Sequence, residues 1–301
     1  MQRPRVMSFY LEPGLKQSAE AGEHNFLNKV AAVGRAAGIT LKFRDAKEAA
    51  VSDPSEEYAV LHMDPPPHQN AVTVRRAYYY PFWSIERTAK RWDFDVAKAV
   101  FDPADVPARD AASFVNRWRR KWFEGWAPGP TGHVYIPLQG RLLERRSFQS
   151  CTPIEMIRAV LAHDRDRPVF ACLHPGERYS AEDIAALDKL EHRNPRFAVQ
   201  MGGMATLLPG CDYVVTQNSS VGLAGYVFAK PLVLFGRIDF HHIALKPYDS
   251  SPAKAIRAAP LHHPDFDAYV WWFLQKMAIN AGRPEAEEKI AARLRGFGWP
   301  V

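Results

Sequence analysis

Short apolar runs alternate regularly with helical patterns from about residue 133 onward, and this alternation limits the folds open to the chain more than any other feature. The predicted strands are nearly continuously apolar, and they are Val134–Leu138, Pro168–Leu173, Phe197–Gln200, Tyr213–Thr216 and Leu232–Phe235. The predicted helices between them are Pro153–His163, Ala181–Glu191 and Val221–Phe228. Continuously apolar strands separated by helices are typical of a parallel sheet covered on both faces. We therefore expect an α/β domain here.

The first third of the chain shows shorter signals of the same kind. Predicted strands are Val6–Leu11, Leu41–Phe43 and Tyr58–Met63, with a helix at Phe26–Ala37 and an extended aromatic segment at Ala77–Trp83. Three successive prolines make residues 63–70 a loop, because proline has no backbone N–H to donate. Further helices are predicted at Ala111–Trp126, Asp265–Ala281 and Glu285–Leu294.

A Pro/Gly cluster at residues 127–132 is the predicted linker between two domains. We place an N-terminal domain at residues 1–128, a second domain at 133–264 and the C-terminal helices at 265–301. A chain of 301 residues is long enough for two cores of this size.

The composition excludes several classes of protein. Hydrophobic residues make up 47% and charged residues 24%, the balance of an ordinary globular protein. Three cysteines without a CxxC pair favour a reducing compartment, and no apolar run reaches the length of a membrane span. The net charge of +6 is too small to indicate a nucleic-acid partner, and no recognised nucleic-acid module is present. We expect a cytoplasmic α/β enzyme that holds no metal.

Polar side chains follow the predicted strands of the second domain. Gln139 follows the first strand, His174 and Glu177 follow the second, and Asn218, Ser219 and Ser220 follow the fourth. Ligands of parallel sheets bind at the carboxyl ends of the strands. The two serines at a helix start fit either an anion site or plain N-capping. The His174-Pro175 pair fits either a ligand contact or a turn that ends a strand.

Three ordered motifs resemble those of bacterial capsular polysaccharide glycosyltransferases, a group that includes transferases of 3-deoxy-manno-octulosonic acid (Kdo). The motifs are PLQ at Pro137–Gln139, HPGE at His174–Glu177 and VVTQNSSVGLAGYVFAKPLVLFG at Val214–Gly236. The His-Pro and Ser-Ser pairs are also similar to motifs of bacterial sialyltransferases. The resemblance covers about residues 134–240.

The resemblance implies an α/β fold of the GT-B type, in which two Rossmann-like domains with parallel sheets face a cleft. It also implies that residues 265–301 return to the first domain and that the second domain holds a nucleotide-sugar. That donor would be a CMP-activated acidic sugar, and the acceptor a glycan or lipid-linked glycan. No cofactor is implied. The donor-binding residues that the motifs match are Gln139, His174, Glu177, Asn218, Ser219, Ser220 and Gly222.

One residue departs from the pattern. The related sequences carry a carboxylate on the helix after the serines, where this chain has Ala224. Three consequences stay open: a different nucleotide, weaker binding, or a vestigial pocket. Two alternative functions follow, a binding or assembly subunit with weakened catalysis and a sugar-nucleotide epimerase.

An inverting transfer needs a base for the acceptor hydroxyl, and a GT-B protein supplies it from the first domain. The candidates are Glu23 and His24, before the first long helix, followed by Asp64 and His62 beside the proline loop. His174 is the candidate that stabilises the leaving phosphate. Glu23 fits equally well as a helix-dipole acid, and Asp64 as a turn residue.

Other prominent patterns have ordinary explanations. Three Asp-x-Asp triplets lie in turns or helix starts rather than at strand ends, and the two His-His pairs lack the i,i+4 spacing of zinc ligands. Phe114, Trp118, Trp122 and Trp126 recur at helical spacing with basic residues between them. This stripe predicts either a core-facing helix or peripheral contact with an anionic inner membrane.

Overall fold

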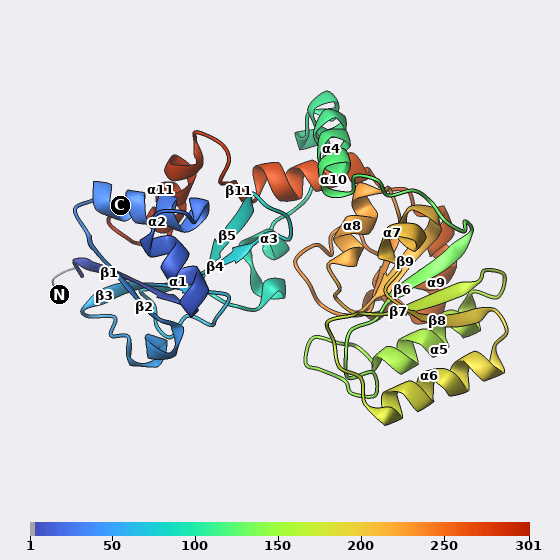
Figure 1. Ribbon diagram of the computed structural model, residues 1–301. Coiled ribbons are helices and arrows are strands. Elements are labelled where there is room, and N and C mark those ends of the chain that lie inside the picture. The colour runs from blue at the N-terminus through green and yellow to red at the C-terminus, as the bar shows by residue number, and fades with distance from the viewer. Residues whose placement is uncertain (1–3) are drawn as a thin grey trace. The chain divides into compact units, whose positions relative to one another are not determined.

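The computed structural model describes residues 4–301, and within that range the chain forms two compact units (Figure 1). Unit 1 takes in the chain up to Ala99 together with Phe273–Val301, and unit 2 is Val100–Trp272. The chain thus passes between units after Ala99, earlier than the linker that the sequence predicts at 127–132. Of the C-terminal residues, 265–272 stay with unit 2 and only 273–301 join unit 1.

Unit 2 is built on a five-stranded sheet in the order β10-β9-β6-β7-β8, and every pair of neighbours is parallel. The strands are β6 (His133–Pro137), β7 (Val169–Leu173), β8 (Phe197–Met201), β9 (Cys211–Thr216) and β10 (Leu232–Leu234). All five lie within a residue or two of the predicted strands, because short apolar runs rich in β-branched and aromatic residues are typical of buried strands.

Between residues 100 and 272, unit 2 also contains seven α-helices. They are α4 (Ala108–Trp122), α5 (Pro153–His163), α6 (Ala181–Arg193), α7 (Met204–Leu207), α8 (Val221–Val227), α9 (Pro252–Ala258) and α10 (Phe266–Trp271). Thr152 and Ser180 cap α5 and α6, each through a capping box with the acid three residues on. The core between α5, α6, α9 and the sheet includes Ile136, Ile157 and Leu190.

The predicted linker lies against unit 2 instead of leading into it. The Gly129 N–H donates to the carbonyl oxygen of Thr206 at 2.9 Å. A Cβ atom on Gly210 would stand 2.2 Å from the carbonyl oxygen of Pro130. Glycine and proline here serve close backbone packing, a use that the sequence pattern does not separate from a linker.

Unit 1 has a mixed sheet of six strands in the order β11-β5-β4-β3-β1-β2. The strands are β1 (Val6–Leu11), β2 (Thr40–Asp45), β3 (Glu57–His62), β4 (Ala71–Arg76), β5 (Phe82–Glu86) and β11 (Ile279–Asn280). The four strands β2, β1, β3 and β4 are parallel, whereas β5 runs antiparallel to β4 and β11 to β5. The expectation of a parallel sheet is therefore wrong at this edge of unit 1.

The helices of unit 1 are α1 (Pro13–Glu20), α2 (Asn25–Ala36), α3 (Asp95–Lys98) and α11 (Ala286–Gly296). Side chains of α2 and α11, among them Val30 and Ile290, form the main core with Phe9 and Val60 of the sheet. The predicted helix over Asp265–Ala281 is wrong only beyond Lys276. A π-helical turn occupies Trp272–Lys276, and the chain then enters β11.

The aromatic stripe of α4 is largely buried. Phe114 and Trp118 are 4% and 8% exposed, and α4 packs against α10. The ring of Trp126 stacks on Phe228 with centroids 5.9 Å apart. This favours the core-facing interpretation of the stripe, and the exposed residues of α4 include Arg117, Arg120 and Lys121. Within residues 4–301, no helix combines the length and the apolar character needed to cross a bilayer.

Candidate functional site

The loops that follow β6 and β7 meet at the carboxyl edge of the unit 2 sheet. The backbone N–H of His174 donates to the Tyr179 hydroxyl at 2.8 Å, and that hydroxyl lies 3.4 Å from the carbonyl oxygen of Leu138. A Cβ atom on Gly140 would stand 2.8 Å from Oε2 of Glu177. These contacts bring the segment around Gln139 together with the segment from His174 to Glu177, as expected for neighbouring parallel strands.

The His174 side chain is exposed and has a defined tautomer preference. Its Nδ1 accepts the N–H of Gly176 at 3.0 Å, so in the neutral ring the proton sits on Nε2. Glu177 is exposed as well. An exposed imidazole N–H at a sheet edge is a donor suited to an anionic oxygen of a ligand.

Ser219 and Ser220 follow β9, and they differ in their surroundings. Ser219 is buried, and its N–H donates to the Thr216 hydroxyl while its own Oγ accepts the N–H of Val221 at 3.3 Å. Ser220 is exposed, and its side chain makes no capping bond to α8. Ser219 therefore fits the capping interpretation, and Ser220 is the serine left for a ligand. Asn218 is half-buried between them and β9.

Two further residues of the motif point inward. A Cβ atom on Gly222 would stand 3.0 Å from Leu232 and 3.1 Å from Phe240, so packing of α8 on the sheet accounts for this glycine. Ala224 is fully buried. A carboxylate at position 224 would need a buried partner, because an unpaired buried charge costs several kcal/mol or more.

A small cavity lies between the ends of β6 and β9. Gln139, Thr216 and Gln217 line it, together with two residues that the sequence analysis missed, Arg146 and Gln149. Burial lowers the pKa of the Arg146 guanidinium, while the nearby Glu177 carboxylate acts in the opposite direction. The sequence carries one weak signal for these residues, the Arg145-Arg146 pair shortly after Gln139.

In unit 1, two histidines lie around Trp83 at the carboxyl ends of the parallel strands. The His24 ring meets the Trp83 ring edge-on with centroids 5.3 Å apart, and the His62 ring lies 6.4 Å from it. The Arg76 guanidinium sits over Trp83 at 5.7 Å. Burial is the main cause that lowers the pKa of each histidine, and the positive charge of Arg76 adds to it. Both rings are therefore neutral at pH 7.

The four residues offered as bases are not equivalent. His24 caps α2, with Nδ1 accepting the N–H of Leu27 at 3.1 Å, so its neutral ring carries the proton on Nε2 and acts as a donor. The Asp64 carboxylate lies close enough to His62 to oppose the lowering of its pKa. Glu23 and Asp64 are both exposed. His62 with Asp64 beside it is the pair best suited to accept a proton.

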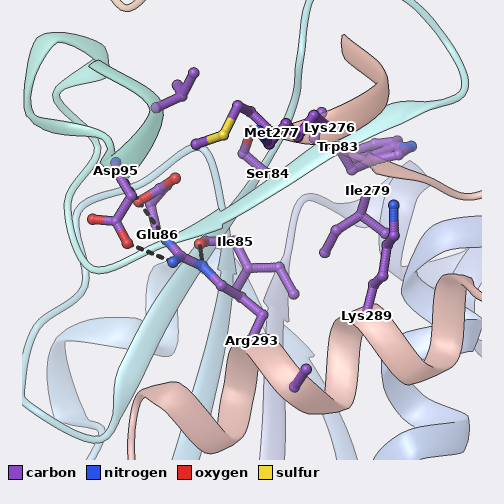
Figure 2. Close-up of a pocket in the computed structure, with 13 residues that line it drawn as sticks. Trp83, Ser84, Ile85, Glu86, Asp95, Lys276, Met277, Ile279, Lys289 and Arg293 are labelled. Atoms are coloured by element: carbon purple, nitrogen blue, oxygen red, sulfur yellow. Dashed lines mark hydrogen bonds and ion pairs between the residues drawn. The ribbon is translucent and has the colours of Figure 1, made fainter. Parts of the chain in front are cut away.

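A larger cavity of about 280 Å³ lies elsewhere in unit 1, beside β5 (Figure 2). Its wall holds Arg293, whose Nε donates to the carbonyl oxygen of Ile85 at 2.8 Å and whose Nη2 donates to Glu86 at 2.9 Å. Arg293 also pairs with Asp95. This arginine covers the edge of β5 beyond the point where β11 ends. Within the described part of the chain, no group of three His, Cys, Asp or Glu side chains could hold a metal ion.

Comparisons with known proteins bear on the fold. No family model matches the sequence, and no curated protein matches it. Among solved structures, KpsC from Thermosulfurimonas dismutans, described as a beta Kdo 2,7 transferase, is similar with a TM-score of 0.55 and 11% identity. The match covers 96% of this chain and 99% of that one. A KpsC beta Kdo 2,4 transferase from the same organism matches with a TM-score of 0.49 and 10% identity, over 89% and 90% of the two chains. WaaG, a glycosyltransferase involved in lipopolysaccharide biosynthesis, has a TM-score of 0.42 at 10% identity, over 98% and 76%.

At these identities the likeness to the first of these structures establishes the fold alone. The chain has the α/β architecture of the GT-B glycosyltransferases, with a Rossmann-like sheet in each unit. The fold class that the sequence motifs implied is thereby confirmed, apart from the antiparallel edge of unit 1.

Proposed function

We propose that this chain is a glycosyltransferase of bacterial surface polysaccharide biosynthesis that takes its sugar from a nucleotide-sugar. The observation that carries the proposal is the meeting of the Gln139 and His174 loops at the carboxyl edge of the unit 2 sheet, in a chain with the GT-B fold. Parallel sheets bind nucleotides at this edge. The donor fitting the motifs is a CMP-activated acidic sugar.

The donor-side chemistry follows from His174. When the sugar is transferred, the bond between the anomeric carbon and the phosphate oxygen breaks, and the phosphate leaves with the electron pair. The Nε2–H of His174 donates to that phosphate as its charge grows, and the exposed Ser220 hydroxyl adds a second donor. Donors aimed at developing charge typically contribute about 2.7–4 kcal/mol each to lowering a barrier.

The acceptor-side chemistry is assigned to unit 1. The acceptor hydroxyl oxygen forms the new bond to the anomeric carbon, and its proton passes to Nε2 or Nδ1 of His62. A neutral imidazole at pH 7 is the state that this step needs, and burial keeps His62 in it. Asp64 then stabilises the imidazolium. The acceptor is a glycan or a lipid-linked glycan.

A second candidate function, a nucleotide-sugar-binding or assembly subunit with weakened catalysis, is favoured by one residue. Ala224 stands where related sequences carry an acid, and it is fully buried. The chain would then bind the nucleotide-sugar without turning it over. Exposed Arg117, Arg120 and Lys121 on α4 are the residues through which either protein would contact an anionic membrane from the cytoplasmic side.

The first experiment is a thermal-shift and calorimetric screen with CMP, UDP, GDP and their sugars. A ligand at 100 times its Kd stabilises the protein by about 2.7 kcal/mol. His174→Ala should then lower turnover about 100–1,000-fold, more than it weakens ground-state binding. His192→Ala, an exposed histidine at the far end of α6, is the control. Turnover without an acceptor indicates an epimerase, and wild type that binds no nucleotide refutes the donor site.

A further inference from the structure

The segment of residues 146–150 is held against the end of the unit 2 sheet by backbone hydrogen bonds. Gln149 forms an antiparallel bridge with Gly236. The Arg237 N–H donates to the carbonyl oxygen of Phe148 at 2.8 Å, and the Ser150 N–H donates to that of Phe235 at 3.0 Å. The segment thus extends the sheet beyond β10 and fixes the side chains that it carries.

Two of these side chains carry buried donors that nothing in residues 4–301 satisfies. Gln149 is 6% exposed, and its Oε1 accepts the backbone N–H of Arg146 at 2.7 Å, which leaves Nε2 without a partner. The Nε and Nη2 atoms of Arg146 are buried and unpartnered as well. A buried donor without a partner destabilises the folded state, and more so when it is charged, so each such group in a native structure calls for an explanation.

These donors line the cavity that Gln139 and Gln217 also border. Its volume of about 10 Å³ accepts the centre of one water-sized atom. A water molecule can satisfy two donors, but it adds no negative charge to that of the nearby Glu177 carboxylate. An anionic oxygen satisfies the donors and balances the charge in one step.

The cavity also offers one acceptor. Gln217 is 4% exposed, its Nε2 donates to the carbonyl oxygen of Cys151 at 2.9 Å, and its Oε1 has no partner among the described residues. A ligand that carries a hydroxyl group next to its anionic oxygen satisfies both kinds of group. Sugar acids and ribose phosphates have this chemistry.

We propose that Arg146 and Gln149 form a subsite that binds one carboxylate or phosphate oxygen of the ligand, with Gln217 accepting from a neighbouring hydroxyl. The assignment rests on the proposed function, because the ligand is taken to be the nucleotide-sugar donor. It goes beyond that function in naming the residues that select an anionic donor group.

The test compares Arg146→Met with Arg145→Met, its exposed neighbour. Calorimetric titrations use inorganic phosphate, cytidine, CMP, UDP-glucose and UDP-glucuronate. We expect Arg146→Met to weaken oxyanion binding at least tenfold and to leave cytidine binding unchanged, whereas Arg145→Met binds every probe as wild type does. Loss confined to UDP-glucuronate assigns the subsite to a sugar carboxylate, and equal loss for both UDP-sugars assigns it to a phosphate.

A second readout needs no ligand. Arg146→Met replaces a half-buried guanidinium, two of whose nitrogens are buried without hydrogen-bond partners, with an uncharged side chain, so we expect its melting temperature to exceed that of wild type. Binding of every probe as tightly as in Arg145→Met overturns the subsite, as does wild type that binds neither phosphate nor nucleotide. If phosphate binds in an Arg146-dependent manner but no nucleotide does, the subsite stands and the glycosyltransferase proposal fails.

Discussion

Gly236 packs closely against Gln217, which lines the small cavity of unit 2, and substitution of Gly236 by alanine tests whether this close packing is required. A Cβ atom on Gly236 would stand 2.5 Å from the carbonyl oxygen of Gln217 and 3.3 Å from Cδ2 of Phe148. Ordinary contacts begin at 3.4 Å, so one of the two backbones must move by about 1 Å. Neither moves freely, because Gly236 is bridged to Gln149 and Gln217 bonds Cys151.

Overpacking of this kind typically costs about 1–3 kcal/mol. For a unit the size of unit 2, each kcal/mol lowers Tm by roughly 2–4 °C, so we expect Gly236→Ala to lower the Tm of unit 2 by about 2–12 °C. Because Gly236 is bridged to Gln149, the same displacement moves the Gln149 donor and should weaken oxyanion binding. Scanning calorimetry with and without phosphate measures both effects.

Gly296→Ala is the matched control. It lies in α11, and no atom comes within 4 Å of an added Cβ. Alanine there should be neutral or stabilising by roughly 0.5–1 kcal/mol. The reasoning is refuted if Gly236→Ala melts with wild type and binds phosphate equally well, since the close approach to Gln217 would then impose no constraint.

Three further outcomes are expected. Burial opposes ionisation of Glu57, but three hydroxyl donors outweigh burial and lower the pKa of this carboxyl. Unit 1 should therefore lose stability as the pH falls below 4.5. Melting curves recorded over a range of pH should show a weaker pH dependence for Glu57→Gln than for wild type. Arg293→Met removes the ion pair with the buried Glu86 carboxylate and the hydrogen bond to the Ile85 carbonyl oxygen, which should cost about 1–3 kcal/mol in denaturant unfolding. Trp118→Ala should destabilise unit 2 by about 3–5 kcal/mol in the same assay. Lys121 is exposed, so Lys121→Ala should leave the free energy of unfolding nearly unchanged and instead weaken binding to anionic vesicles.

The sequence predicts unit 2 better than unit 1, and the reason lies in the strands. Strands such as β6 and β9 contain nearly continuous apolar runs, VYIP and YVV, so composition identifies them directly. β4 was missed, because its sequence AVTVRR mixes apolar and basic residues and follows the proline loop. β11 has only two residues, and it is recognised as a strand only by its backbone pairing with β5.

The sequence likewise predicts one part of the candidate site and misses another. Gln139 and His174 could be placed because they directly follow strands, and the order of parallel strands brings such residues together. Arg146 and Gln149 could not, since the pairing of their segment with Gly236 joins residues far apart in the sequence. A buried donor without a partner is likewise invisible before packing is known.

The boundary between the units makes unit 2 an insertion in unit 1, which begins before Ala99 and resumes at Phe273. During synthesis, every residue of unit 2 leaves the ribosome before β11 and α11 exist. At roughly 5–20 residues per second, the open edge of β5 waits on the order of 10 to 40 s for Arg293 to cover it. Unit 2 can complete its own core in that time, while the first 99 residues hold an uncapped sheet without Ile290 and Leu294. The nascent chain is therefore most exposed to aggregation through the part of unit 1 that precedes unit 2, and a chaperone that protects it has to act there until α11 emerges.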